Sequence, residues 1–438
     1  MQRPNPEPTP IPSRRDVIAG AAAVAGLITA ACASDRSIAS LGPLGRGQPH
    51  KPIAPHETIR IGVIGTGGMG TGHCEAIAGL AKAGKEKVQI AAVSDVCKPR
   101  LEAARKLCAE KQAIAVDGYR SYHDLLSRDD LHGVLIASPE HWHAQMAIDA
   151  MQAGKDVYVE KPMTLRMDDA LRLRRVAMAS DKVLQVGTQF LTHRKYHEAR
   201  KLIEADEIGQ PTMIQTSYCR NSKEGEWLYG IDPEVEPGEM LDWEGWCGPL
   251  GPQRWDTEVY HRWRRYRSYS TGIIGDLLVH VMTPLVFALD CGWPVRVLAT
   301  GAHYADPAME NHDQVNLTVQ FERPCTLLVA GSTCNELGLE TLIRGHRANL
   351  YLGSKDCVLK PERVFAEEID EKKVECPSLS DQDEHRLDWL ACMRTRAKPL
   401  GDVDLAARIM VIVDLATRSI WEGRAMTFDP LALRASPA

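Results

Sequence analysis

The first half of the chain alternates short β-branched apolar runs with amphipathic stretches. Five of these runs predict buried strands, at residues 58–64, 88–93, 133–139, 156–160 and 183–187. Helical stretches lie between them, over about residues 72–83, 101–110, 140–153 and 168–180. Strands that alternate with helices are typical of a doubly wound parallel sheet. The pattern therefore predicts an α/β domain over residues 58–187, in which ligands bind beyond the carboxyl ends of the strands.

From about residue 188 the pattern changes. Helices are expected at about residues 193–205, 270–290 (with Ser270 or Thr271 as N-cap), 384–395 and 404–422. Alternating runs predict strands at residues 211–220, 295–303, 314–322, 325–333, 339–344, 349–352 and 357–360. An irregular segment over residues 221–269 is rich in Trp, Tyr and Arg. We expect an α+β domain over residues 188–430 with a large, open, mainly antiparallel sheet, and helix 404–422 is a candidate to pack back on the first domain.

The N-terminal segment looks like an export signal. Arg14 and Arg15 precede a short Ala-rich apolar run that ends at Ala31-Cys32-Ala33, which is the layout of a signal peptide. The paired arginines resemble the twin-arginine signal, whose machinery exports folded proteins. We expect a signal over residues 1–33, a Ser/Gly/Pro-rich linker over 34–57 and a periplasmic protein that meets the twin-arginine machinery. An alternative interpretation makes Cys32 a lipid-attachment site.

Composition and charge narrow the class of protein. The 438 residues are 44% hydrophobic and 25% charged, which is an ordinary globular mixture. The net charge of −6 argues against a basic nucleic-acid surface. Apart from Cys32, the cysteines are scattered and form no Cys-x-x-Cys pair, so we expect buried thiols rather than metal ligands.

A glycine motif follows the first predicted strand. Gly65, Gly67 and Gly70 form G-x-G-x-x-G between that strand and a helix. In such a motif the first glycine allows a tight turn, the second lets the backbone approach a pyrophosphate, and the third allows close helix packing. Asp95 ends the second strand, where an acid accepts the ribose hydroxyls and repels a 2′-phosphate. The motif thus favours NAD over NADP, although Lys98 and Arg100 lie close by.

Three further residues are candidates for catalysis. Lys161 follows a strand at its carboxyl end, and Asp276 and His280 lie four residues apart, on one face of a predicted helix. Around a nicotinamide, such a group of side chains could oxidise an alcohol, because His suits proton transfer near neutral pH. On the residues alone, Lys161 could equally end a strand in solvent, and Asp276 and His280 could be an ordinary helix pair.

Together, Gly65-x-Gly67-x-x-Gly70, Asp95, Glu160-Lys161-Pro162 and Asp276-x-x-x-His280 resemble the Gfo/Idh/MocA oxidoreductases, which include glucose–fructose oxidoreductase and inositol dehydrogenases. The resemblance runs from about residue 58 to Pro430. It implies an N-terminal Rossmann domain, an open-sheet domain lining the substrate pocket, and Lys161, Asp276 and His280 as the catalytic trio. It also implies that the chain is a homo-oligomer.

The resemblance and the glycine motif together give the expected cofactor-binding residues: Gly65, Gly67, Gly68, Met69, Gly70, Asp95, Ser138, Pro139, His141, His143, Glu160, Lys161 and Gln189. His141 and His143 could instead be metal ligands, but no third ligand is apparent, so no metal is expected. The resemblance places their loop beside the nicotinamide. Val281-Met282-Thr283 departs from the acidic residues that many members carry after the His, which leaves polyol contacts there in doubt.

The leading hypothesis is an exported NAD-dependent oxidoreductase that transfers hydride between a sugar, glycoside or polyol carbon and a tightly held nicotinamide. The first alternative is an NAD-dependent glycoside hydrolase that acts by transient C3 oxidation and elimination. Some exported relatives look like such hydrolases but lack the Glu160-Lys161-Pro162 triplet that this chain keeps. The second alternative is a non-catalytic sugar-binding protein, which the intact trio disfavours.

Overall fold

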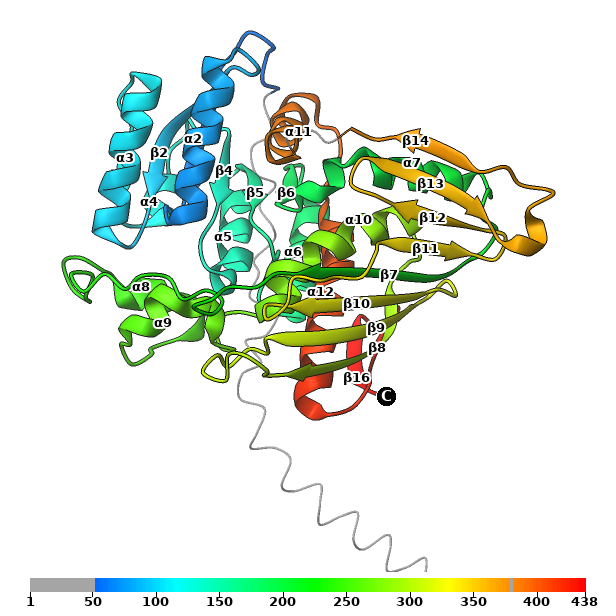
Figure 1. Ribbon diagram of the computed structural model, residues 1–438. Coiled ribbons are helices and arrows are strands. Elements are labelled where there is room, and N and C mark those ends of the chain that lie inside the picture. The colour runs from blue at the N-terminus through cyan, green and yellow to red at the C-terminus, as the bar shows by residue number, and fades with distance from the viewer. Residues whose placement is uncertain (1–51, 378–380) are drawn as a thin grey trace, which may run out of the picture. The chain divides into compact units, whose positions relative to one another are not determined.

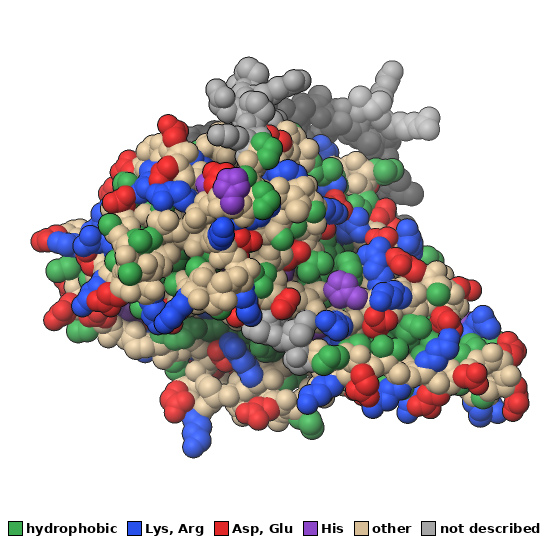
Figure 2. Space-filling view, turned by 90° about the horizontal axis from the view of Figure 1, so that it is seen from above, with side chains coloured by type: hydrophobic (Ala, Val, Ile, Leu, Met, Phe, Trp, Pro, Cys, Tyr) green, Lys and Arg blue, Asp and Glu red, His purple; other side chains and the backbone are tan. Residues whose placement is uncertain are grey.

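The computed structural model describes residues 52–377 and 381–438. The expected signal and residues 34–51 of the expected linker lie outside these residues. Among the described residues, no helix is long and apolar enough to cross a membrane. On the face seen in Figure 2, acidic and basic side chains are interspersed rather than gathered by sign.

The N-terminal domain is a doubly wound parallel sheet, as predicted. Its six strands run in the order β3-β2-β1-β4-β5-β6. Their bounds are β1 Ile59–Ile64, β2 Val88–Ser94, β3 Asp117–Tyr119, β4 Gly133–Ile136, β5 Asp156–Val159 and β6 Leu184–Val186. The helices that connect them are α2 Gly68–Lys82, α3 Lys98–Gln112, α4 Tyr122–Leu126, α5 Glu140–Gln152 and α6 Met167–Ala179. This strand order is that of a dinucleotide-binding Rossmann domain.

The C-terminal domain contains a ten-stranded sheet in the order β14-β13-β12-β11-β7-β10-β9-β8-β15-β16. Its strands are β7 Pro211–Cys219, β8 Pro294–Ala302, β9 Gln314–Phe321, β10 Thr326–Ser332, β11 Leu342–Gly345, β12 Ala348–Leu352, β13 Asp356–Pro361, β14 Lys372–Glu375, β15 Met426–Asp429 and β16 Arg434–Pro437. Most neighbouring strands pair antiparallel, while β7 and β10 pair in parallel. The expected open sheet is therefore present, with a mixed centre.

Helices cover one face of this sheet (Figure 1). They are α7 Arg194–Glu204, α10 Val279–Leu289 and α12 Val403–Glu422. The long helix α12 contacts β8 and also α6 of the first domain, and Arg174 of α6 forms an ion pair with Asp404 at its start. Helix α11, Asp381–Thr395, packs on the N-terminal domain through Trp389 and Leu390. Buried apolar residues thus run continuously from one domain into the other.

The aromatic segment 221–269 contains only short helices, α8 Trp243–Cys247 and α9 Thr257–Arg262. Its own small core includes Trp243, Trp246 and Tyr260. The segment is joined to the N-terminal domain by backbone hydrogen bonds, from Lys98 N to Met240 O and from Asp242 N to Val96 O. It therefore lies beside the carboxyl end of β2, although it belongs to the second half of the chain.

Candidate active site

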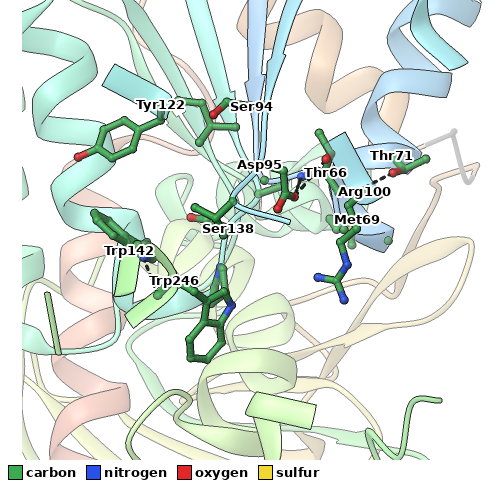
Figure 3. A pocket seen from close by; sticks show the side chains of 18 of the residues that line it. Thr66, Met69, Thr71, Ser94, Asp95, Arg100, Tyr122, Ser138, Trp142 and Trp246 are labelled. Carbon is green, nitrogen blue, oxygen red and sulfur yellow. Dashed lines mark hydrogen bonds between the residues drawn. The ribbon is translucent and has the colours of Figure 1, made fainter. Parts of the chain in front are cut away.

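A cavity of about 1010 Å³ lies beyond the carboxyl ends of β1, β2 and β4 (Figure 3). Gly65 has a φ of 84° and lies so close to Ala137 and Ser138 that a side chain would collide with their backbone. A Cβ at Gly70 would overlap the carbonyl oxygen of Gly65, whereas a Cβ at Gly68 would meet nothing within 4 Å. The first and third motif glycines are thus required by packing.

Helix α2 starts at Gly68, four residues earlier than expected. Its N-cap is Gly67, which has no side chain to accept a hydrogen bond from the first-turn amides. Uncapped amides at a helix N-terminus bind anions such as a diphosphate. The cavity volume is at the upper end of the ~300–1,000 Å³ range of ligand pockets. The glycine loop and the uncapped amides of α2 therefore fit a dinucleotide.

Asp95 lies on the cavity wall and points toward Thr66 (Figure 3). Its Oδ2 accepts hydrogen bonds from Thr66 N at 2.7 Å and Thr66 Oγ1 at 3.1 Å, and its Oδ1 accepts one from Cys97 N at 2.8 Å. The carboxylate is therefore fixed by the glycine loop itself. The Arg100 guanidinium lines the same cavity and stacks over Tyr260, 4.9 Å from the ring centroid.

Ser138 and Pro139 line this cavity together with Met69, whereas His141 and His143 do not reach its wall. Trp142, between them on α5, is the side chain that points into it. Both histidines are buried: His141 Nε2 lies 2.8 Å from Trp246 O, and the two ring nitrogens of His143 lie 2.7 Å from the carbonyl oxygens of Pro162 and Ser138. Successive helical residues point in different directions, so Trp142 faces this cavity while the two histidines expected beside a nicotinamide are turned into the protein interior.

A second cavity, of about 240 Å³, adjoins the first, because Met69, Tyr229 and Arg264 line both. Lys161, Asp276 and His280 line it, as do Glu160 and Gln189. Lys161 comes from the end of β5, while Asp276 and His280 come from the helical segment before and within α10. The trio expected from the sequence is thus brought together from both domains.

The Lys161 ammonium is tied to Asp276 twice. Its Nζ donates hydrogen bonds of 2.9 Å to Asp276 Oδ1 and 2.9 Å to Asp276 O. Arg264 Nε donates to the same Oδ1 at 3.1 Å. Burial alone would raise the pKa of Asp276, but the charges of Lys161 and Arg264 hold it well below its usual range. Asp276 is therefore an ionised anchor that fixes both cations.

His280 is held as a neutral imidazole. Burial and the nearby Lys161 charge lower its pKa to about 3. Its buried Nδ1 has no hydrogen-bond partner within the described residues. An unpaired buried nitrogen is costly unless a ligand or water satisfies it. Because the ring is neutral and His280 lines the cavity, the imidazole can serve as a proton acceptor for a hydroxyl group bound there.

Glu160 has a role that the sequence did not indicate. Arg386 Nε donates to His73 Nδ1 at 2.9 Å, so the proton of the His73 ring is on Nε2, which donates to Glu160 Oε1 at 2.8 Å. Burial alone would raise the pKa of Glu160, but His73 and Lys161 lower it to about 2. Glu160 is thus an ionised carboxylate close to Lys161.

The geometry of Asp276 depends on a local irregularity. Residues Ile274–Leu278 form a π-helical turn, and α10 continues from Val279. Such turns add one residue to a helix and occur frequently at functional sites. The turn packs the Asp276 carboxylate toward Lys161, a detail that a regular helical period does not predict.

Sequence reasoning missed several lining residues. Arg220 follows β7 directly, and Arg264 lies in the aromatic segment. An alternating strand pattern does not indicate what the residue at its end contacts, and the aromatic segment has no periodic pattern, so only its richness in Trp and Arg drew attention to it. No group of three or more His, Cys, Asp or Glu side chains in the described part of the chain could hold a metal ion.

Curated relatives match a limited part of the chain. Inositol 2-dehydrogenase of Salmonella paratyphi B is 30% identical over 158 residues, which cover 36% of this chain and 45% of that protein. A glycosyl hydrolase family 109 protein of Shewanella baltica is 36% identical over 173 residues, which cover 37% of this chain and 36% of that protein. The chain therefore spans less than half the length of these relatives.

Solved structures match nearly the whole described fold. Levoglucosan dehydrogenase in complex with NADH and levoglucosan superposes with a TM-score of 0.63 at 17% identity, covering 84% of this chain and 99% of that one. The WlbA dehydrogenase of Bordetella pertussis, in complex with NADH and UDP-GlcNAcA, gives 0.62 at 19% identity, covering 85% and 99%. At these identities the likeness concerns the fold.

Two family descriptions match the chain almost end to end. "Oxidoreductase family, NAD-binding Rossmann fold" matches residues 59–188, and "Oxidoreductase family, C-terminal alpha/beta domain" matches residues 193–436. The glycine cradle, the Rossmann strand order and the open sheet agree with both. The chain therefore belongs to the Gfo/Idh/MocA oxidoreductase family and carries that family's NAD-binding domain.

Proposed function

We propose that the protein is an exported, NAD-dependent oxidoreductase that transfers hydride between a hydroxyl-bearing carbon of a sugar, glycoside or polyol and a tightly held nicotinamide. The observation that carries this proposal is the convergence of Lys161, Asp276 and His280 on a polar cavity next to the dinucleotide cavity. A homo-oligomer is part of the proposal on family resemblance.

The side chains have distinct tasks in this reaction. When bound, a nicotinamide supplies the hydride acceptor. Neutral His280 takes the proton of the substrate hydroxyl as the carbon–hydrogen bond breaks, so the products are a carbonyl group and an imidazolium. Lys161 uses two of its N–H groups on Asp276, and its third can donate to the substrate oxygen and stabilise the developing negative charge. Asp276 keeps this ammonium in place. In the reverse direction His280 returns the proton.

The aromatic segment 221–269 supports the retention of the cofactor. It contributes to the wall of the 1010 Å³ cavity opposite the glycine loop, with Tyr229, Gly230, Asp242, Gly245, Trp246, Tyr260, His261, Trp263 and Arg264. Its Trp246 carbonyl accepts hydrogen bonds of 2.8 Å from Trp142 Nε1 and from the His141 ring. A molecule in this cavity would thus lie between two domains. Retention would suit a protein that is loaded before a twin-arginine export step.

A second candidate is an NAD-dependent glycoside hydrolase, and the 36% identity to the Shewanella baltica family 109 protein favours it. In that reaction, oxidation at C3 acidifies the C2 hydrogen, elimination releases the aglycone, and the hydride is returned after water adds. The same trio would serve both reactions. The Glu160-Lys161-Pro162 triplet is the residue-level argument for net oxidation.

The test is mass spectrometry of products after the NAD-loaded protein is incubated with free sugars and glycosides. A product two hydrogens lighter, absent with Lys161→Ala and His280→Ala, would support the oxidoreductase. Free sugar plus aglycone without an oxidised product would support the hydrolase. Binding without any conversion across the panel would contradict both enzymatic candidates and favour a sugar-binding protein.

Export has its own test. A reporter fusion of residues 1–57 should reach the periplasm with Arg14 and Arg15 present and stay in the cytoplasm when both are replaced by Lys. Incorporation of labelled fatty acid into the wild-type chain but not into Cys32→Ala would indicate lipid attachment instead of simple cleavage.

A further inference from the structure

Glu140 is a buried carboxylate that the proposed chemistry does not use. It opens α5 and is only 1% exposed. Its Oε1 accepts a 2.6 Å hydrogen bond from the Ser270 hydroxyl, and its Oε2 accepts bonds from Thr271 N at 3.2 Å and Thr271 Oγ1 at 3.3 Å. Ser270 and Thr271 directly precede the helical segment that carries Asp276. A side chain of the NAD-binding domain therefore holds the start of the substrate-side helix.

The same turn of α5 also holds the segment that carries Lys161. His143 lies three residues after Glu140, and its Nδ1 lies 2.7 Å from the carbonyl oxygen of Pro162, which follows Lys161 directly. Lys161 in turn donates to Asp276. These hydrogen bonds connect three segments in a ring. Glu140 contacts the 270–276 segment, Asp276 of that segment binds Lys161, and Pro162, next to Lys161, contacts His143, which lies on the same helix as Glu140.

This ring of hydrogen bonds joins the two domains at the point where the proposed reaction occurs. Ser270 Oγ also accepts the N–H of Gly272 at 3.1 Å, so the link continues into the first helical turn. Without the carboxylate, buried donors of Ser270 and Thr271 would lose their acceptor, which is unfavourable for groups removed from water. The 270–276 segment could then shift relative to Lys161. A displacement of about 1 Å between reacting groups can cost roughly a hundredfold in rate.

We propose that Glu140 is a positioning residue: by holding Ser270 and Thr271 it sets Asp276 and His280 at their working distance from Lys161. The catalytic part of this inference rests on the proposed oxidoreductase function. The structural part, the coupling of Glu140 to the 270–276 segment, does not depend on it.

The variants Glu140→Ala and Glu140→Gln separate position from charge. Alanine removes every acceptor. Glutamine keeps the shape: its carbonyl can accept from Thr271 N, and its amide can donate to Ser270 Oγ once that hydroxyl rotates. We expect kcat to fall about tenfold to a hundredfold in Glu140→Ala, with KM and the dissociation constant for NADH within about threefold, and we expect Glu140→Gln to retain most of the activity.

Two measurements distinguish positioning from simple loss of stability. Hydrogen–deuterium exchange of a peptide covering residues 270–276 should be faster in Glu140→Ala than in wild type and near wild type in Glu140→Gln. A double-mutant cycle with Ser270→Ala should be strongly non-additive in kcat, because both changes remove the same hydrogen bond between Glu140 and Ser270.

Asp156 provides a matched control. It is a fully buried carboxylate at the start of β5, the strand that leads to Lys161, and it accepts hydrogen bonds from Val183 N and the Arg396 guanidinium. None of these bonds reaches the 270–276 segment. Asp156→Asn should lower the melting temperature and leave kcat per folded molecule and exchange over 270–276 unchanged.

The outcomes are decisive in each direction. If Glu140→Ala lowers the melting temperature as Asp156→Asn does but leaves kcat and the exchange of 270–276 at wild-type values, the positioning role is wrong. If glutamine fails to restore kcat although exchange is normal, the charge rather than the position matters, and the inference is equally wrong. If the wild-type protein converts no sugar at all, the proposed function fails, while the exchange data still decide whether Glu140 holds the segment.

Discussion

At the scale of single residues, Asp276 Oδ1 receives two cations, Lys161 Nζ and Arg264 Nε. Sharing one oxygen fixes the Lys161 ammonium beside the cavity while leaving His280 uncharged. Lys161 can therefore act as a charged hydrogen-bond donor while His280 acts as a neutral proton acceptor. The neutrality of His280 has a consequence for the pH dependence of catalysis.

Because burial and Lys161 lower the pKa of His280 to about 3, this residue stays neutral across the physiological range. An ordinary histidine would titrate at about 6.5. The pH dependence of kcat/KM reports ionisations of the free enzyme. We therefore expect kcat/KM to show no ionisation of His280 between about pH 5.5 and 8, the range in which an ordinary histidine would titrate. A pH–rate profile of wild type measures this, and an acid limb centred near the ordinary histidine value that disappears in His280→Gln would contradict it.

The glycine loop gives a second prediction at this scale. A Cβ at position 70 would overlap the carbonyl oxygen of Gly65, while a Cβ at position 79, on the same helix but away from the cavity, has open space. Gly70→Ala should therefore abolish NADH binding, and Gly79→Ala should leave the dissociation constant within about threefold, less than 1 kcal/mol. Fluorescence titration with NADH compares the two variants, and equal affinity would show that the loop adapts more than its packing indicates.

At the scale of elements, the sequence predicted most of what regular periodicity can reveal. The β-branched runs identified five of the six Rossmann strands, and the alternation from Val295 onward identified most of the antiparallel sheet. The short strand β3, Asp117–Tyr119, was missed because its three residues contain no apolar run. The π-helical turn at Ile274–Leu278 was missed because it differs from an α-helix by one residue of hydrogen-bond register. Strand β14 was missed because Lys372–Glu375 is largely polar and exposed. Arg264 was missed because the segment that carries it has no period.

The aromatic segment supplies a prediction about the cofactor. Asp242 caps α8 by accepting from Gly245 N at 2.8 Å, and it lines the larger cavity. Loss of an N-cap costs about 1 kcal/mol, which corresponds to roughly a fivefold change in an equilibrium or rate constant. Asp242→Ala should therefore speed NADH dissociation about fivefold. Stopped-flow displacement measures the rate.

Asp402 is the control for this change. It caps α12 by the same chemistry, accepting from Asp404 N and Leu405 N, and it does not line the cavity. Asp402→Ala should destabilise the fold by a similar amount without altering the NADH off-rate. Equal acceleration in both variants would mean that general loosening, and not the aromatic segment, controls release.

At the scale of the whole molecule, several buried histidines make folding sensitive to acid. Burial lowers the pKa of His280 to about 3, and of His141 and His385 to about 4. The unfolded chain, with values near 6.5, binds more protons than the folded chain between these limits, so stability falls as the pH decreases through this window. Each histidine accounts for about 2 kcal/mol at pH 5, from roughly 1.5 units at 1.36 kcal/mol per unit.

Glu140 acts in the opposite direction. Burial, with a further contribution from the Asp276 charge, raises its pKa to about 7, so the folded state binds the extra proton and gains about 2 kcal/mol between pH 7 and pH 5. We expect a net loss of roughly 3 to 4 kcal/mol in the free energy of unfolding at pH 5 relative to pH 7. Urea denaturation at both values measures it. His385→Gln should reduce the loss by about one histidine's share, and an unchanged loss would show that His385 is not held neutral.

The wall that segment 221–269 adds to the larger cavity has a consequence for kinetics. If a nicotinamide is reduced in place and does not leave, the oxidised first product must depart before an acceptor can enter the smaller cavity, because both would need Lys161 and His280. Turnover would then follow a ping-pong scheme in which two substrates alternate at one site. Initial rates at several acceptor concentrations would give parallel double-reciprocal lines, and added NAD in the medium would leave the rate unchanged.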